Sequence, residues 1–165
     1  MTVERLSNQR WGFSSMCFVC EDANPHGLRL PFFHDTEAGT VFADVDLTET
    51  FSGAPSYAHG GILMALMDEA MSWATIAVAG TFAMTASNEH RFLRPVRLGR
   101  PYRVEARIEG TDGEAIATVA SITSASTGKV AADGRARFVP LDASGTEAAV
   151  GQAVIGADAA FIRDQ

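Results

Sequence analysis

The longest hydrophobic stretch of the chain, residues 55–80, repeats its apolar positions with the spacing of an α-helix and is apolar around almost the whole circumference. A helix of this kind is either buried in a protein core or spans a membrane. Asp68, Glu69 and Ser72 interrupt its middle, which argues against a membrane span. The pattern therefore predicts a buried central helix of about 20 residues, ~30 Å long.

Shorter stretches alternate hydrophobic and polar residues, which is the period of a β-strand with one buried face. Residues 40–47 alternate most regularly, and residues 28–33 form a shorter strand that Pro31 marks as a sheet edge. After the helix we expect four strands that follow one another as a meander, with turns at 111–113 and 126–128. These four strands are predicted at residues 84–93, 101–109, 114–124 and 130–139.

Together these elements predict an α+β fold in which one antiparallel sheet curls around the long central helix. Residues 1–27 form an N-terminal arm, residues 28–140 the main domain, and residues 141–165 a weak helix or frayed tail. One sheet cannot cover both its faces and both its edges by itself. We therefore expect a homo-oligomer, either a homodimer or a homotetramer built as a dimer of dimers.

The composition is that of one ordinary globular domain, with 165 residues of which 47% are hydrophobic and 20% charged. The net charge of −7 argues against a nucleic-acid-binding protein. The first ten residues contain no apolar stretch like that of a signal peptide. We therefore expect a cytoplasmic protein that has neither a nucleic acid nor a membrane as its partner.

Cys17 and Cys20 are the only cysteines and are spaced C-x-x-C. A zinc site would need two more ligands, and only His26 and His34 lie near them in the sequence. A redox pair would need a thioredoxin-like strand–helix context, which the surrounding residues do not provide. The sequence favours two reduced thiols in an N-terminal loop, with a zinc site as the alternative.

Two adjacent glycines, Gly60 and Gly61, fall in the predicted first turn of the helix, where each costs roughly 0.5–1 kcal/mol relative to alanine. Their presence is explained if backbone N–H groups must approach a ligand closely. The free N–H groups of a helix N-terminus suit an anion or a developing oxyanion. The alternative is a loose junction between loop and helix that binds nothing.

Asp68 is the second feature of the helix that indicates chemistry. Gly61, Ala65, Asp68 and Ser72 recur at helical spacing and form a face of small residues around one carboxylate. Such a carboxylate is either paired structurally or has a raised pKa and a chemical role. Glu69 is the rival candidate, but consecutive helical residues point about 100° apart, so only Asp68 shares the glycine face.

The motif Ala58-His59-Gly60-Gly61, with an Asp nine residues after the His, resembles the helix start of the hotdog-fold acyl-CoA thioesterases. The similarity is to the phenylacetate-degradation, or PaaI-like, type and covers residues 17–139. Other matching pieces are CFVCEDANPHGLRL, MTAS and RFLRPVRLGRPYRVEARI. The resemblance implies a curled sheet around a long helix, an acyl-CoA substrate and a site that lies between two subunits.

The resemblance also implies roles for individual residues. Asp68 would be the catalytic carboxylate, as nucleophile or as general base for water. The backbone N–H of Gly60 or Gly61 would form the oxyanion hole. His59 would help to position the thioester, and Thr85 the attacking water. Such chemistry needs one base or nucleophile and one oxyanion donor, with no metal and no cofactor beyond the CoA of the substrate.

Three places depart from the family pattern. The loop before His59 lacks an Asn that many relatives carry, which affects the positioning of water. Asn88 and His90 occupy strand positions that are usually apolar, so they predict a polar acyl-binding pocket or an altered core. Glu21 follows the second cysteine where related arms often have Gly, a change without an expected consequence.

Six of the 13 basic residues are arginines within residues 91–107. They form a solvated strand face or bind phosphates, and Arg91, Arg94 and Arg97 are the candidates for the CoA nucleotide. The predicted function is hydrolysis of an acyl-CoA thioester to the free acid and CoA. One alternative is a non-catalytic acyl-CoA or fatty-acyl binding module. Another is a hotdog hydratase, whose expected Asp and His pair on a different segment is not found.

Overall fold

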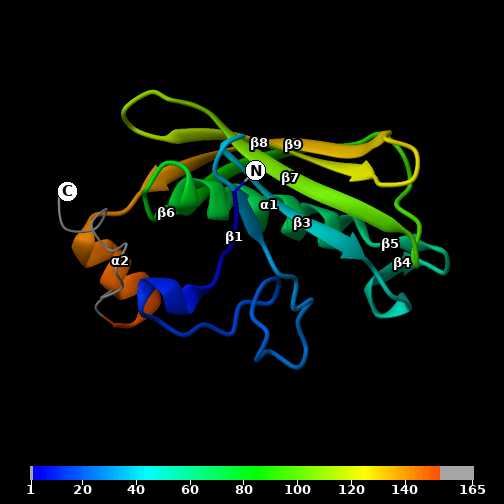
Figure 1. Ribbon diagram of the computed structural model, residues 1–165, viewed down its shortest axis with the longest axis horizontal. Helices are drawn as coiled ribbons and strands as arrows, with labels where there is room; N and C mark the ends of the chain where they lie inside the picture. Colours follow the sequence, from blue (N-terminus) through cyan, green and yellow to red (C-terminus); the bar gives the residue numbers. More distant parts are fainter. Residues whose placement is uncertain (1, 153–165) are drawn as a thin grey trace.

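The computed structural model describes residues 2–152 and consists of a seven-stranded antiparallel sheet that curves over one long helix, α1 (Gly60–Ala77) (Figure 1). A small second sheet pairs β4 (Ser52–Ala54) with β5 (Tyr57–Ala58), directly before α1. Short 3-10 helices cover Asn8–Trp11 and Glu49–Phe51. The strands of the large sheet are, in spatial order, β1 (Val3–Arg5), β2 (Phe33–Asp35), β3 (Thr40–Asp46), β7 (Pro101–Thr111), β8 (Ile116–Ser124), β9 (Val130–Pro140) and β6 (Ala83–Phe92).

Helix α1 is the buried central helix that the sequence predicts. It packs against β3, β6, β7, β8 and β9, and Leu66, Met67 and Met71 are completely buried there. Each such side chain contributes roughly 1.5–3 kcal/mol when it is removed from water. Among the described residues no helix combines the length and hydrophobicity needed to cross a bilayer.

The other side of α1 is covered by the part of the N-terminal arm that follows β1 and by α2 (Ala143–Val150), both of which lie opposite the sheet in Figure 1. The ring centroids of Trp11 and Trp73 are 5.4 Å apart, and those of Phe13 and Phe82 are 6.0 Å apart. Because the sheet covers one side and the arm the other, α1 is apolar almost all round. The predicted weak C-terminal helix corresponds to α2, and residues 153–165 of that tail lie outside the described residues.

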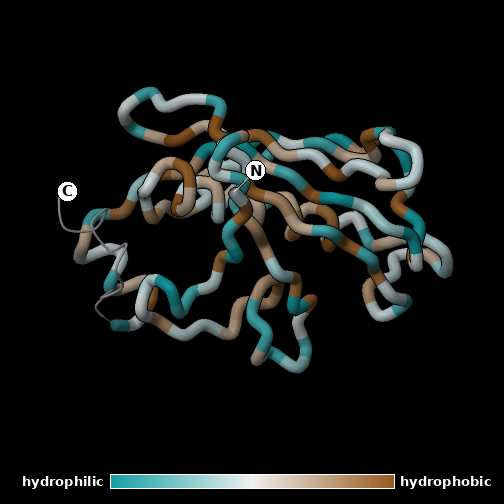
Figure 2. The backbone as a smooth tube through the Cα atoms, in the orientation of Figure 1, coloured by the Kyte–Doolittle hydropathy of each residue, from teal (hydrophilic) through white to brown (hydrophobic). Residues whose placement is uncertain are grey.

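The strand predictions for residues 40–47 and for the region after the helix are confirmed to within a few residues. Hydrophilic and hydrophobic colours alternate along the sheet strands in Figure 2, as expected for a sheet with one face on a core. Gly113 and Gly128 have φ angles of 87° and 68°, so the two predicted turns use the left-handed conformation that glycine adopts without strain.

The strand predicted at residues 28–33 is wrong, because the strand in this region begins only at Phe33. The backbone N–H groups of Leu28 and Leu30 instead donate to the carbonyl oxygens of Phe18 and Val19, at 2.8 Å each. Pro31 has no N–H to contribute to a sheet. The arm also supplies an unpredicted strand, β1, which pairs with β2 at the sheet edge.

The predicted four-strand meander is also wrong. Strands β7, β8 and β9 do follow one another, but β6 pairs with β9 at the far edge and β7 pairs with β3. Alternation fixes which face of a strand is buried, not which strand lies beside it. The consequence for the site is that β6, which carries Thr85, Asn88 and His90, is an edge strand.

Candidate active site

His59 caps the N-terminus of α1, where the sequence predicts an anion-binding turn. Its Nδ1 accepts the Gly61 N–H at 2.9 Å, which requires the tautomer with the proton on Nε2. A Cβ at Gly61 would lie 3.1 Å from that nitrogen, and one at Gly53 would lie 2.9 Å from His59 Cα. Gly61 therefore makes room for the imidazole of His59, and Gly53 makes room for the backbone of His59. The Gly60 N–H has no acceptor among the described residues.

Asp68 lies two turns further along α1 and is half-buried. Two side chains of β6 donate hydrogen bonds to the same carboxylate oxygen, Oδ1: Thr85 Oγ1 at 2.9 Å and Asn88 Nδ2 at 2.7 Å. The second oxygen, Oδ2, has no hydrogen-bond partner in the described part of the chain. The carboxylate is thus held in place through one oxygen while the other is available to a ligand.

A β-bulge in β6 brings both donors to Asp68. Thr85 is paired with Phe138 and Ser87 with Arg137, so Ala86 is an extra residue in the ladder. In a regular strand, residues three apart point to opposite faces. The bulge reverses the alternation, and Thr85 and Asn88 both face α1. The sequence led us to expect Thr85 near the site and Asn88 in an acyl pocket, but it carried no signal that Asn88 contacts Asp68.

His90 is the next residue of β6 on the same face, opposite Gly134 of β9. Both ring nitrogens are enclosed and have no partner among the described residues. A Cβ at Gly134 would lie only 2.5 Å from His90 Nδ1, so a glycine is needed there. Burial lowers the pKa of His90, and the charge of Asp68 opposes part of that shift.

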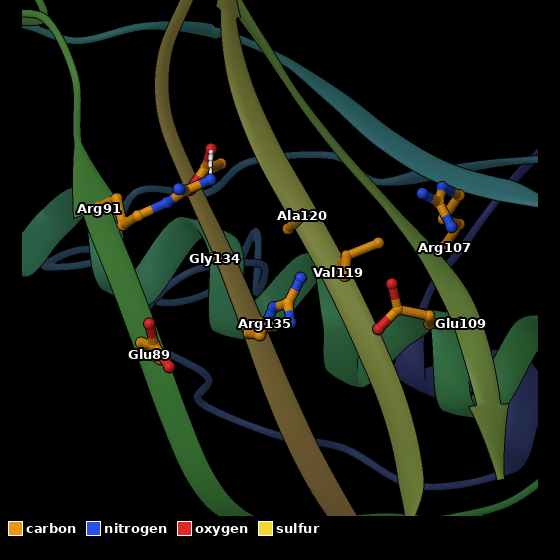
Figure 3. Close-up of a pocket in the computed structure, with 9 residues that line it drawn as sticks. Glu89, Arg91, Arg107, Glu109, Val119, Ala120, Gly134 and Arg135 are labelled. Atoms are coloured by element: carbon orange, nitrogen blue, oxygen red, sulfur yellow. Dashed lines mark hydrogen bonds and ion pairs between the residues drawn. The ribbon is translucent and has the colours of Figure 1, made fainter.

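The three candidate arginines do not share one environment. Arg91 lies in β6, whereas Arg94 and Arg97 lie in the segment that follows β6. Arg91 is on the outer face of the sheet, away from α1, and makes two hydrogen bonds of 2.8 Å to Asp133 beside a charged groove of about 370 Å³ (Figure 3). Arg94 donates to the Val130 carbonyl oxygen at 2.5 Å. The Arg97 guanidinium lies 5.7 Å from the ring centroid of Tyr57, three residues before the start of α1.

Glu69 faces a different environment from Asp68, as the helical spacing predicts. Its Oε1 accepts a hydrogen bond from Cys17 Sγ at 3.4 Å, and Cys20 Sγ completes the cluster. Burial raises the pKa of Glu69 to about 8, and the nearby Cys17 adds to that shift. The neighbouring Cys20 thiol lowers the pKa of Cys17 to about 5, and Cys17 together with burial raises the pKa of Cys20.

Comparison with known proteins agrees with the fold and the resemblance. The family profile described as "Thioesterase superfamily" matches residues 56–131, which include the helix start, Asp68 and β6. No curated protein matches the chain. A thioesterase superfamily protein of known crystal structure is 28% identical over 79% of this chain, with a TM-score of 0.71. The chain covers 64% of the length of that protein.

Two further solved structures are similar to this chain. A thioesterase from Ralstonia eutropha JMP134, described as phenylacetic acid degradation-related, is 27% identical over 64% of this chain and 79% of its own, with a TM-score of 0.56. A Streptococcus pneumoniae TIGR4 thioesterase protein with coenzyme A is 17% identical over 62% of this chain and 81% of its own, with a TM-score of 0.58. The fold of the chain is therefore the hotdog fold, and its resemblance to thioesterases is confirmed.

Proposed function

We propose, from the hotdog fold that this chain shares with thioesterase superfamily proteins, that it hydrolyses an acyl-CoA thioester to the free acid and CoA. The observation that carries the proposal is the carboxylate of Asp68, held through Oδ1 by Thr85 and Asn88 while Oδ2 is open. A fixed carboxylate with one free oxygen is the arrangement that a general base or a nucleophile needs.

Two balanced routes use this carboxylate. As a base, Asp68 takes a proton from water while the water oxygen bonds to the thioester carbon; the C–S bond then breaks and the CoA sulfur leaves with that proton. As a nucleophile, Oδ2 bonds to the carbon, CoA leaves as the thiolate, and water cleaves the resulting anhydride. In both routes the Thr85 hydroxyl donates to Asp68 and its own oxygen can accept a hydrogen bond from water.

The oxyanion of the tetrahedral intermediate needs a donor, and Gly60 is our candidate. The Gly61 N–H is already bound by His59 Nδ1, whereas the Gly60 N–H has no acceptor among the described residues. His59 would then use its Nε2–H to position the thioester. A free N–H at the positive end of a long helix is suited to a developing negative charge.

We further propose that the site is shared between two copies of the chain. Gly60 precedes Asp68 by eight residues on one helix, a rise of about 12 Å, whereas one reacting carbonyl must contact both within about 3 Å. The glycine turn opposite Asp68 therefore comes from a partner. The open edge of β6, with Met84 and Phe92 each 53% exposed, supports association there.

The binding residues are proposed by position. Arg94 and Arg97 belong to a segment that pairs with the residues just before α1, because the Ala58 N–H donates to Val96 O. This position near the start of α1 makes them our first candidates for binding the CoA phosphates. Arg91 is already paired with Asp133, so we assign it a weaker, long-range electrostatic contribution. Asn88 and His90 would border the acyl group. Asn88 contacts Asp68 directly, and His90 is the next residue of β6 on the same face.

Release of free thiol from a panel of acyl-CoA esters tests the function, with binding of the same esters measured by calorimetry. We expect thiol release with at least one ester. Tight binding of acyl-CoA without thiol release would contradict hydrolysis and indicate the binding-module alternative. If the protein neither binds nor cleaves any ester of the panel, an acyl-CoA substrate is contradicted altogether.

A further inference from the structure

Two cysteines of the N-terminal arm and one glutamate of α1 form a cluster that the proposed hydrolysis does not use. Cys17 Sγ, Cys20 Sγ and a Glu69 carboxylate oxygen all lie within 4.8 Å of one another. Cys17 Sγ is 3.4 Å from Glu69 Oε1. His26 and His34, the ligands that the sequence offered for a zinc site, are not members of the cluster.

The separations are close to those around a tetrahedral zinc ion. Bonds of ~2.3 Å to sulfur and ~2.0–2.2 Å to a carboxylate oxygen place neighbouring ligand atoms about 3.5–3.8 Å apart. The contact of 3.4 Å between Cys17 and Glu69 is near that range, and the limit of 4.8 Å on the other two separations exceeds it by about 1.0–1.3 Å. Two thiolates and one carboxylate are a donor set that suits Zn²⁺.

The cysteine loop is held in this shape by its own backbone. The Val19 N–H donates to Cys17 Sγ at 3.4 Å, which favours the thiolate that a metal needs. The Leu28 N–H donates to Phe18 O at 2.8 Å. A Cβ at Gly27 would lie only 2.5 Å from that same oxygen, so the glycine permits the close approach that fixes the loop.

A cavity of about 440 Å³ adjoins the cluster and is lined in part by Cys17, Cys20, Glu69 and Trp73. The indole Nε1–H of Trp73 is buried and has no acceptor among the described residues. A buried indole donor is normally satisfied by an acceptor. The oxygen of a water molecule in this cavity would provide one.

We infer that Cys17, Cys20 and Glu69 bind one Zn²⁺ ion, with a water molecule from the adjoining cavity as the fourth ligand. Binding displaces the thiol protons to solvent, as is general for cysteine ligands. The ion would fasten the arm to α1 on a different face from Asp68, so its role is separate from the thioester chemistry. Because three protein ligands leave one position open, the site is distinct from a closed four-ligand structural site.

Cobalt binding tests this inference on the full-length protein. The reduced protein, freed of metal by a chelator, is titrated with Co²⁺ and then with Zn²⁺. We expect equimolar binding with thiolate-to-cobalt charge-transfer absorption and tetrahedral d–d bands, all lost when Zn²⁺ displaces the cobalt. Zinc should also raise the Tm of the wild type. Absence of the charge-transfer absorption in the wild type would overturn the inference, whatever the variants do.

Four variants identify the ligands. Cys17→Ser and Cys20→Ser should each remove most of the charge-transfer absorption and the zinc-dependent rise in Tm. Glu69→Gln should keep the absorption but weaken metal binding by roughly tenfold or more. The double variant His26→Ala/His34→Ala is the matched control and should bind cobalt like the wild type. Loss of binding in the histidine variant, with normal binding in Glu69→Gln, would overturn the assignment.

Discussion

At the scale of single residues, the proposed chemistry depends on Asp68, whose two carboxylate oxygens have different surroundings. Thr85 and Asn88 both bind Oδ1, so a substitution of Asp68 by Asn keeps a carbonyl oxygen for these donors and loses the basic oxygen. The shape of the site is retained. Any loss of activity in that variant therefore reports chemistry and not misfolding.

We predict that Asp68→Asn lowers kcat by about 10²–10⁴-fold, the usual effect of losing a positioned acid–base group. Steady-state thiol release with the best ester of the panel measures the change. Glu89→Gln is the control, because Glu89 is a carboxylate of β6 that lies on the outer face, in the groove shown in Figure 3. Equal activity of Asp68→Asn and the wild type would rule out Asp68 as base or nucleophile.

His90 provides a prediction about pH. Burial lowers its pKa, so on acidification the unfolded chain binds a proton more readily than the folded one. The free energy of unfolding should therefore fall as the pH drops from about 7 to about 5, through the ordinary pKa of histidine. Urea denaturation at both pH values measures this loss, which should be smaller in His90→Gln.

An imidazole titration by NMR checks the same residue directly. The pKa of His90 should lie below the ordinary value in the wild type, and lower still in Asp68→Asn because the charge of Asp68 raises it. A His90 pKa at or above the ordinary value, or one unaffected by Asp68→Asn, would contradict the described burial of His90 beside Asp68.

At the scale of elements, the contact between β6 and β9 depends on a glycine. The Cβ of Gly134→Ala would lie 2.5 Å from His90 Nδ1 and 3.1 Å from the Glu89 carbonyl oxygen. We predict a loss of roughly 1–3 kcal/mol in the free energy of unfolding, the usual cost of overpacking. Denaturant unfolding measures it, and Gly110→Ala in β7 is the control because a Cβ there meets nothing within 4 Å.

A double-mutant cycle identifies the cause of that loss. If His90 is the obstacle, His90→Ala should recover a large part of the stability lost in Gly134→Ala, which appears as a coupling energy between the two sites. Independent, additive effects would show that the ring of His90 is not packed against Gly134.

The elements also show which parts of the structure the sequence can predict. The apolar circumference of α1 and the alternation in β3 and β7 are local patterns, and they predicted those elements correctly. The partner of β6 depends on how the chain crosses after residue 93, and no local pattern encodes that. No sequence pattern predicts the bulge at Ala86 either, although the bulge is what allows Asn88 to contact Asp68.

The candidate site divides in the same way. The His59-Gly60-Gly61 start and Asp68 could be located from helical spacing together with the family resemblance. The cluster of Glu69 with Cys17 and Cys20 could not, because it joins residues 49 or more positions apart across the arm and α1. Contacts of that kind follow from tertiary packing and leave no periodic signature.

At the scale of the whole molecule, the arm, the helix and the sheet form one core, yet the edge strand β6 and the start of α1 remain uncovered. Gly61 is exposed, and so are Met64, Phe92 and Leu93. Large apolar side chains beside an open sheet edge are typical of a surface that associates. We therefore expect sedimentation to show at least a dimer. A fully active monomer would contradict the shared site.

Gly60→Pro removes the proposed oxyanion donor while preserving the fold. Gly60 is the first residue of α1, where proline is tolerated, and His59 has φ −67° and ψ 134°, which suits a residue before proline. We predict a loss of about 10²–10³-fold in kcat. Gly60→Ala keeps the N–H, and its Cβ would meet Phe92 at an ordinary 3.6 Å, so it should retain much more activity than Gly60→Pro.

Mixing the two impaired variants, Asp68→Asn and Gly60→Pro, tests the central claim most directly. In a mixed dimer of Asp68→Asn and Gly60→Pro, one site combines the intact Asp68 of one chain with the intact Gly60 of the other. We predict that thiol release, lowered about 100-fold or more in each variant alone, rises far above both parents when the two chains are exchanged into mixed dimers. If verified mixed dimers remain as inactive as either parent, Asp68 and Gly60 do not act across the subunit interface, and the shared-site account is wrong.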